Sequence, residues 1–168
     1  MFALHPTARL LKRLRVPLTI EPPETTTRLG DWYVNLLHVG RQQLVLAVSE
    51  KTLLPVVIPA APHPTLVPRL RVSVAEVLGM LGIASEAIEH ELASMADVAY
   101  GKTTNRQILG VMVDFAKGLP FYVDREGTLL NVSMTLAETP CSPLYKTRIS
   151  PDRTTIALFE EAALRLVH

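Results

Sequence analysis

The stretch from Tyr100 to Thr104 reads Tyr-Gly-Lys-Thr-Thr, and a Gly-Lys-Thr before a helix is how a phosphate-binding loop ends. Such a loop needs a further glycine five positions before its second one, where this chain has Ala96. The incomplete match indicates a capped helix start with a basic neighbour, not a nucleotide-hydrolysing loop. Because the dipole of a helix favours anions at its N-terminus, Lys102, Asn105 and Arg106 could still hold an anion there.

The same predicted helix carries a stripe of three unlike residues, Arg106, Gly110 and Asp114, spaced four apart. A glycine inside a helix costs about 1 kcal/mol relative to alanine, and it often lets another backbone or a ligand come close. Tight packing of the helix against a sheet of the same domain is the favoured explanation. The alternative is a surface for a partner or ligand, formed by Lys102, Asn105, Arg106, Gly110 and Asp114.

The start of the chain is strongly basic. Residues 1–20 hold Arg9, Lys12, Arg13 and Arg15 and no acidic residue. On an amphipathic helix the first three would share one face, which could grip phosphates, although a solvated basic face is the simpler alternative. With Arg41 they form a candidate basic patch, and the fold could extend it with Lys102, Arg106, Lys146 and Arg148.

The single cysteine, Cys141, lies in a turn bounded by prolines. A nucleophilic thiol needs a nearby base, and the candidate is His38, so a buried structural thiol is the favoured interpretation. The histidines show no metal-ligand spacing to one another. We therefore expect neither a metal site nor a cofactor.

The composition is that of an ordinary globular protein. The 168 residues carry 17 basic and 16 acidic side chains, for a net charge of +1, and 48% of them are hydrophobic. That balance argues against a histone-like positive coat and against wholesale disorder. One cysteine and no apolar run of membrane-spanning length lead us to expect a soluble, cytoplasmic protein.

The hydrophobic pattern predicts one α+β domain over residues 1–168, β-rich in 1–60 and helix-rich in 66–168. The first element is a helix from Thr7, as N-cap, to Arg15. An antiparallel meander follows in three runs: Trp32 to Val39, Gln42 to Ser49 and Leu53 to Ile58. Gly40-Arg41 suits a type II′ turn between the first two runs. The prolines of the third run place that strand at an edge of the sheet. Because nearly every position in these strands is apolar, we expect the sheet to be covered on both faces.

Capping and stop signals predict the helices of the second half. The first runs from a capping box at Ser73–Glu76 to Gly82, and the second from Ser85 to about Met95, with Glu86, Glu89 and Glu91 in solvent. A third begins at Thr103 or Thr104 and closes at Gly118 and Pro120, and Leu129 to Ala137 favours a fourth. The last helix starts at Ser150-Pro151, with a core face of Ile156, Phe159, Ala163 and Leu166.

Several stretches, taken together, resemble a known family. They are Gly30-Asp31-Trp32-Tyr33-Val34-Asn35-Leu36, Leu53-Leu54-Pro55-Val56, Tyr100 to Arg106 with Gly110, and Leu136-Ala137-Glu138-Thr139-Pro140-Cys141. The family is an uncharacterised one of small bacterial proteins of unknown function, often found in plasmid-like or mobile-element settings, and the resemblance covers about residues 3–159. It implies an α+β fold and a bacterial cytoplasmic setting, without assigning an activity.

Three functional hypotheses follow. The leading one is a non-catalytic interaction or regulatory module in a defence or mobile-element context, whose partner is a protein or a second copy, or else a nucleic acid. The second is a toxin-like enzyme that processes nucleic acid or uses a nucleotide, with Lys102, Arg106 and Asp114 near its site. The third is a DNA-binding regulator that uses Arg9, Lys12 and Arg13.

Overall fold

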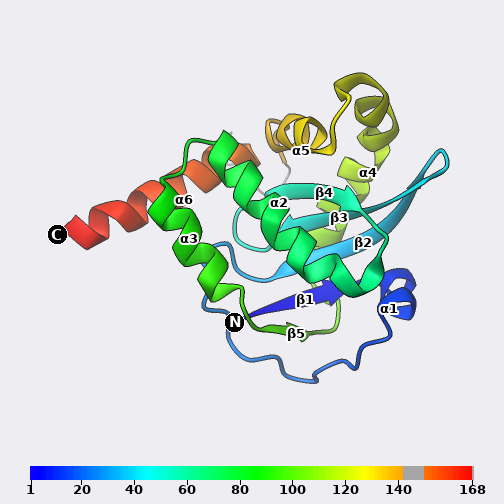
Figure 1. Ribbon diagram of the computed structural model, residues 1–168, viewed down its shortest axis with the longest axis horizontal. Helices are drawn as coiled ribbons and strands as arrows, with labels where there is room; N and C mark the ends of the chain where they lie inside the picture. Colours follow the sequence, from blue (N-terminus) through cyan, green and yellow to red (C-terminus); the bar gives the residue numbers. More distant parts are fainter. Residues whose placement is uncertain (142–149, 168) are drawn as a thin grey trace.

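The computed structural model describes residues 1–141 and 150–167 (Figure 1). Its strands are β1 (Phe2–Pro6), β2 (Trp32–Val39), β3 (Gln42–Ser49), β4 (Pro55–Pro59) and β5 (Val98–Tyr100). Its helices are α1 (Ala8–Leu14), the 3-10 turn η1 (His63–Thr65), α2 (Leu66–Met80), α3 (Ser85–Ser94), α4 (Arg106–Glu126), α5 (Leu129–Ala137) and α6 (Pro151–Val167). The α+β class is confirmed.

The predicted meander is present, and the predicted turn between its first two strands is confirmed. β2 and β3 pair antiparallel from Trp32 opposite Ser49 to Val39 opposite Gln42, which leaves a two-residue turn with Gly40 at φ +60°. β4 pairs with β3 and lies at an edge of the sheet, as its prolines predicted. The hydroxyl of Ser133 on α5 accepts the Val57 N–H at 2.9 Å, so a helix protects this edge.

The N-terminal prediction was wrong in one respect. The chain begins with a strand and not with a helix, because residues 2–6 insert as β1 between β2 and β5. β1 runs parallel to both neighbours, with Leu4 opposite Trp32 on one side and Tyr100 on the other. The sheet, in the order β4-β3-β2-β1-β5, is therefore mixed and not antiparallel throughout.

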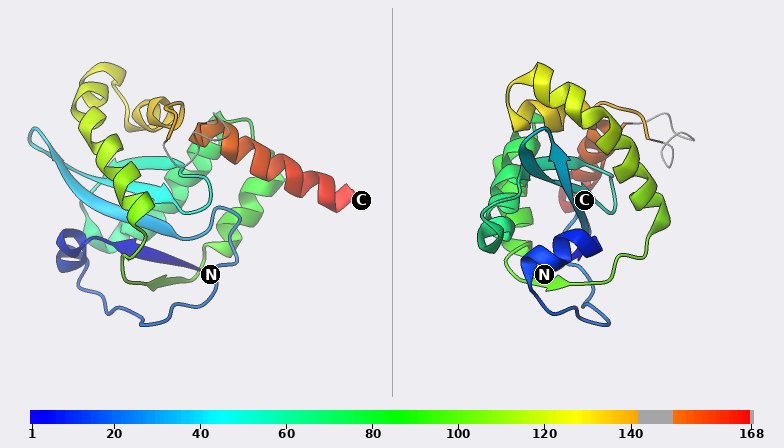
Figure 2. Two further views of the ribbon diagram at one scale, coloured as in Figure 1. Left: turned by 180° about the vertical axis from the view of Figure 1, so that it is seen from behind. Right: turned by 90° about the vertical axis from the view of Figure 1, so that its right-hand side faces the viewer.

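Helices cover both faces of the sheet, as the two-sided apolar strands predicted (Figure 2). On one face, Phe2 and Leu4 of β1 join a core with α2 and α3. On the other face, Tyr33 of β2 packs with Met112 and Phe115 of α4. A side chain that lies between the sheet and a helix, on either face, is therefore surrounded by close-packed neighbours that fix its position.

Several helix boundaries differ from the prediction. α3 and α5 lie where expected, and α6 begins at the predicted Pro151. α2 begins at Leu66, so the capping box at Ser73 lies inside the helix. α4 continues through Gly118 and Pro120 to Glu126, because apolar packing of Leu119 and its neighbours outweighs the hydrogen bond that the proline removes.

Two predicted side-chain roles also change. Thr7 occupies the N-cap position of α1, but its hydroxyl donates to Asn35 Oδ1 at 2.8 Å and caps no helix amide. Glu91 was expected in solvent and is buried instead. Its carboxylate accepts the backbone N–H groups of Arg28 and Leu29 at 2.9 and 3.1 Å, which satisfies two donors of the segment before β2.

In the part of the chain that the structure describes, we find no helix with both the length and the hydrophobicity needed to cross a membrane.

Candidate functional site

The candidate site lies at the edge of the sheet where the parallel strands β1 and β5 end. β1 leads into α1, whose Leu10 belongs to the core on the α2 face, and β5 leads into α4 on the opposite face. In open parallel sheets, ligands bind where neighbouring strands send the chain to opposite faces. This edge is the place where the topology itself favours a binding surface.

His5, at the end of β1, connects three segments of the chain at this edge. Its Nδ1 bonds to the Lys102 carbonyl at 2.9 Å and its Nε2 to Asp31 Oδ2 at 3.0 Å. The ring stacks on Tyr33 with the centroids 4.5 Å apart. Because a carbonyl and a carboxylate both accept, both ring nitrogens must donate, and His5 is an imidazolium paired with Asp31.

The pKa of His5 reflects opposing effects. Burial lowers the pKa, while the hydrogen bonds to Asp31 and to the Lys102 carbonyl and the charges of Asp31 and Glu50 raise it, so that the net shift is upward. A group whose pKa is raised by folding binds its proton more tightly in the native state. Its contribution to stability is complete below the unfolded pKa of about 6.5 and is lost as the pH rises through the folded pKa.

We therefore expect the free energy of unfolding to fall as the pH is raised above about 6.5 and through the folded pKa of His5. Urea unfolding at a series of pH values measures this. His5→Gln should flatten the dependence in this window, whereas His38→Gln, at an exposed position on β2, should leave it unchanged. A wild-type stability that is constant or rises with pH would show that His5 is not the charged cross-link described.

The loop between β5 and α4 is held against β1 by backbone contacts. The Gly101 N–H donates to the Leu4 carbonyl at 2.8 Å, and the Thr103 hydroxyl donates to the Pro6 carbonyl at 2.7 Å. Gly101 is required because a Cβ there would lie 2.7 Å from His5 Cε1 and 2.9 Å from Pro22 Cγ. This loop therefore presents its side chains from a fixed backbone next to the start of α1.

The predicted anion site at the start of α4 is only partly formed. The cap is Asn105 and not Thr103 or Thr104, and its side-chain oxygen accepts the amides of Gln107 and Ile108 at 3.0 and 3.2 Å. Those amides are thus already satisfied and unavailable to an anion. Lys102 and Arg106 are exposed beside them and are the groups that can contact a ligand.

The stripe of Arg106, Gly110 and Asp114 faces solvent. A Cβ on Gly110 would meet nothing within 4 Å among the described residues, so the favoured explanation, tight helix-to-sheet packing, is wrong. Asp114 lies one turn before Gly118, on the rim of a separate small cavity. The structure therefore does not join Asp114 to Lys102 in a single site.

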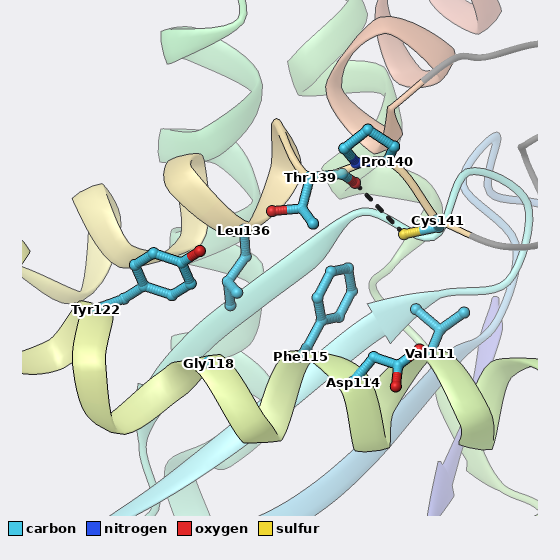
Figure 3. Close-up of a pocket in the computed structure, with 9 residues that line it drawn as sticks. All are labelled: Val111, Asp114, Phe115, Gly118, Tyr122, Leu136, Thr139, Pro140 and Cys141. Carbon is cyan, nitrogen blue, oxygen red and sulfur yellow. Dashed lines mark hydrogen bonds between the residues drawn. The ribbon is translucent and has the colours of Figure 1, made fainter.

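That cavity lies between α4 and the end of α5 and has a volume of about 110 Å³ (Figure 3). Phe115 and Leu136 point into it, and Cys141 and Asp114 lie at its margin. Burial, together with the charge of Asp114, raises the pKa of the Cys141 thiol to about 11. His38 does not line the cavity, so the Cys141–His38 pair is not formed, and the thiol is buried as favoured.

Basic residues at the C-terminal end of α1 line a groove. Lys12, Arg13 and Arg15 face His63 of η1 across a space of about 360 Å³. Arg9 is exposed one turn earlier on α1 but does not line the groove. Arg41 lies at the tip of the β2–β3 hairpin, which the views show apart from α1 (Figures 1 and 2). Lys146 and Arg148 lie outside the described residues.

The sequence analysis missed the residues that position this edge, His5, Asp31 and Tyr33. The signal that could have found them was the set of stretches that carry the family resemblance, because residues 30–36 hold Asp31 and Tyr33 and residues 100–106 hold the loop that His5 binds. Asp31 is itself fixed, because its Oδ1 accepts the Ala3 N–H at 2.9 Å. Groups of three or more potential metal ligands are absent from the described residues.

Searches of the curated proteins and of the solved structures found no match to this chain. One family model does match, and its match spans both motifs that meet at His5. The chain therefore belongs to the family described as Domain of unknown function (DUF6933), whose model matches residues 3–154.

Proposed function

We propose that the protein is a non-catalytic binding module that holds the phosphate backbone of a nucleic acid in the basic groove beside α1. The groove itself is the observation that carries the proposal. Its lining residues are Lys12, Arg13, Leu14, Arg15, His63 and Pro64, which include three cations and no carboxylate. Phosphate contacts of this kind supply most of the affinity of sequence-independent nucleic-acid binding.

The neighbourhood of the groove supports the same ligand. His63 and Pro64 of η1 form the other wall of the groove and carry no negative charge, so that wall does not repel a phosphate. The Thr103–Pro6 hydrogen bond brings the loop that carries Lys102 to the start of α1. The cations of α1, including Arg9, and those around the start of α4, including Arg106, thus lie near the same edge of the sheet although they are far apart in the sequence.

The buried reactive groups support binding over catalysis. Both ring nitrogens of His5 are engaged, so this histidine has no free nitrogen to act as a general base. The raised pKa of Cys141 keeps its thiol protonated near neutral pH, which makes it a poor nucleophile. The proposal therefore rests on the exposed cations of the groove as the groups that contact a ligand.

Fluorescence anisotropy with a labelled DNA duplex tests the proposal. Three or four phosphate contacts predict an affinity that falls roughly 40- to 150-fold between 50 and 200 mM salt. The triple variant Lys12→Ala/Arg13→Ala/Arg15→Ala should bind more weakly, with a salt slope shallower by about 3. A gel of the same duplex after incubation should show it intact, because the module binds and does not cleave.

A matched control removes the same charge elsewhere. Lys117→Ala/Arg125→Ala/Arg153→Ala takes three exposed cations from α4 and α6 and should retain the wild-type slope. Equal losses in the two triple variants would mean that net charge, and not the groove, attracts the duplex. Binding to vesicles with anionic lipid but not to single- or double-stranded oligonucleotides would overturn the proposal, as would cleavage of the duplex.

A further inference from the structure

The last helix, α6, is anchored through its first half only. Pro151, Thr155 and Phe159 are buried, and the Thr155 hydroxyl donates to the Thr52 hydroxyl at 2.9 Å. Beyond Phe159 the helix runs away from the body of the molecule (Figures 1 and 2). Leu164 and Leu166 on this overhang are 61% and 81% exposed.

The overhang continues the apolar stripe that anchors the helix. Phe159, Ala162 and Leu166 are spaced three and four apart and therefore lie on one face. The sequence predicted a core face reaching Ala163 and Leu166, but both are exposed, and in the described part of the chain nothing covers them. Two helical turns with an uncovered apolar face are marginal in water and are stabilised by a packing partner.

A groove runs along this face. On the α6 side it is lined by Leu158, Ala162 and Leu166, with Glu161 and Arg165 beside them. The body of the protein supplies Arg28 and Lys51, and the space between is about 340 Å³. The Arg28 guanidinium also lies 5.9 Å from the centre of the Phe159 ring, which fixes that wall next to the anchored half of the helix.

The charges on the overhang are arranged so that they can pair with the same charges on a second copy of the helix. Glu161 and Arg165 are one turn apart and lie on the same flank of the apolar stripe. When two identical helices pair antiparallel, each flank meets the same flank of the other helix, as in coiled coils with charged flanking positions. Glu161 then faces Arg165 of the partner subunit, and the reverse pair forms by symmetry.

We propose that two copies of the chain associate through their α6 overhangs, paired antiparallel so that each fills the groove beside the other. The occupant is a second copy because the stripe and its flanking charges match themselves. This surface lies at the opposite end of the molecule from α1 (Figure 1), and the pairing does not depend on nucleic-acid binding.

Sedimentation equilibrium of the full chain tests the pairing. At about 100 µM the wild type should contain species of twice the monomer mass, as expected for a small symmetric interface. Leu166→Glu places a carboxylate in the stripe and should leave the protein monomeric. Glu161→Arg and Arg165→Glu each convert both symmetric pairs into like-charge pairs, and each should raise the dimer Kd at least about tenfold.

The double variant Glu161→Arg/Arg165→Glu is the decisive control. It exchanges the two charges, restores both pairs, and should return the Kd to within about threefold of wild type. Because both side chains are exposed, circular dichroism should show an unchanged fold in all these variants. A wild type that stays monomeric at this concentration, a dimer unaffected by Leu166→Glu, or a double variant no tighter than the single ones would each overturn the proposal.

Discussion

Glu91→Ala is expected to lower the free energy of unfolding by about 3–5 kcal/mol. Glu91 is 1% exposed, and its carboxylate accepts the backbone N–H groups of Arg28 and Leu29, the latter in a buried bond. Alanine leaves both amides without that acceptor and opens a cavity beside them. The loss should be large because these bonds hold the segment that enters β2 against α3, across a long loop of chain.

Urea unfolding at neutral pH measures this loss, and two variants of the same helix sharpen it. Glu91→Gln keeps one acceptor oxygen and should recover part of the stability. Glu89→Ala removes an exposed carboxylate two residues away and should change stability by less than about 0.5 kcal/mol. If Glu91→Ala cost no more than Glu89→Ala, the two amides would have to be satisfied in another way.

Gly101→Ala is expected to lower the free energy of unfolding by about 1–3 kcal/mol, because the new methyl group would overlap the His5 ring and Pro22. The ring cannot simply rotate away, since hydrogen bonds on both nitrogens and the stack on Tyr33 hold it. The same strain should loosen the loop that carries Lys102 at the candidate site.

Gly110→Ala provides the matched control and should have the opposite sign. A Cβ there meets nothing in the described structure, and alanine is favoured over glycine inside a helix by about 0.5–1 kcal/mol. The two variants differ from the wild type by one methyl group each, so thermal and urea unfolding compare them directly. A stable Gly101→Ala protein would mean that His5 does not clamp this loop.

Much of the fold could be predicted because its signals are local. The β2–β3 hairpin follows from a two-residue turn with Gly40 first, and α3 and α5 follow from residues within their own length. β1 was missed because five residues that include His5 and Pro6 carry little strand pattern. They form a strand through pairing with β2 and β5, far along the chain.

Helix ends failed where packing outweighed local preference. Gly118 and Pro120 predict a stop, yet α4 continues through them, because Leu119 is buried in the core against the sheet. Gly118 suits this position because the Tyr122 ring lies 2.8 Å from where its Cβ would be. The glycine that was expected to permit close approach, Gly110, has open space instead.

The sequence by itself determined the α+β class, the meander, several of the helices and the basic character of the first helix, because alternation, turn residues and charge are properties of short segments. Only the tertiary structure decided what these segments do together. His5 meets Lys102 across 97 positions and Glu91 meets Arg28 across 63, and such contacts depend on how the chain is threaded through the sheet. The candidate site therefore depends on the topology, which places β1 between β2 and β5, two strands that no local sequence pattern connects.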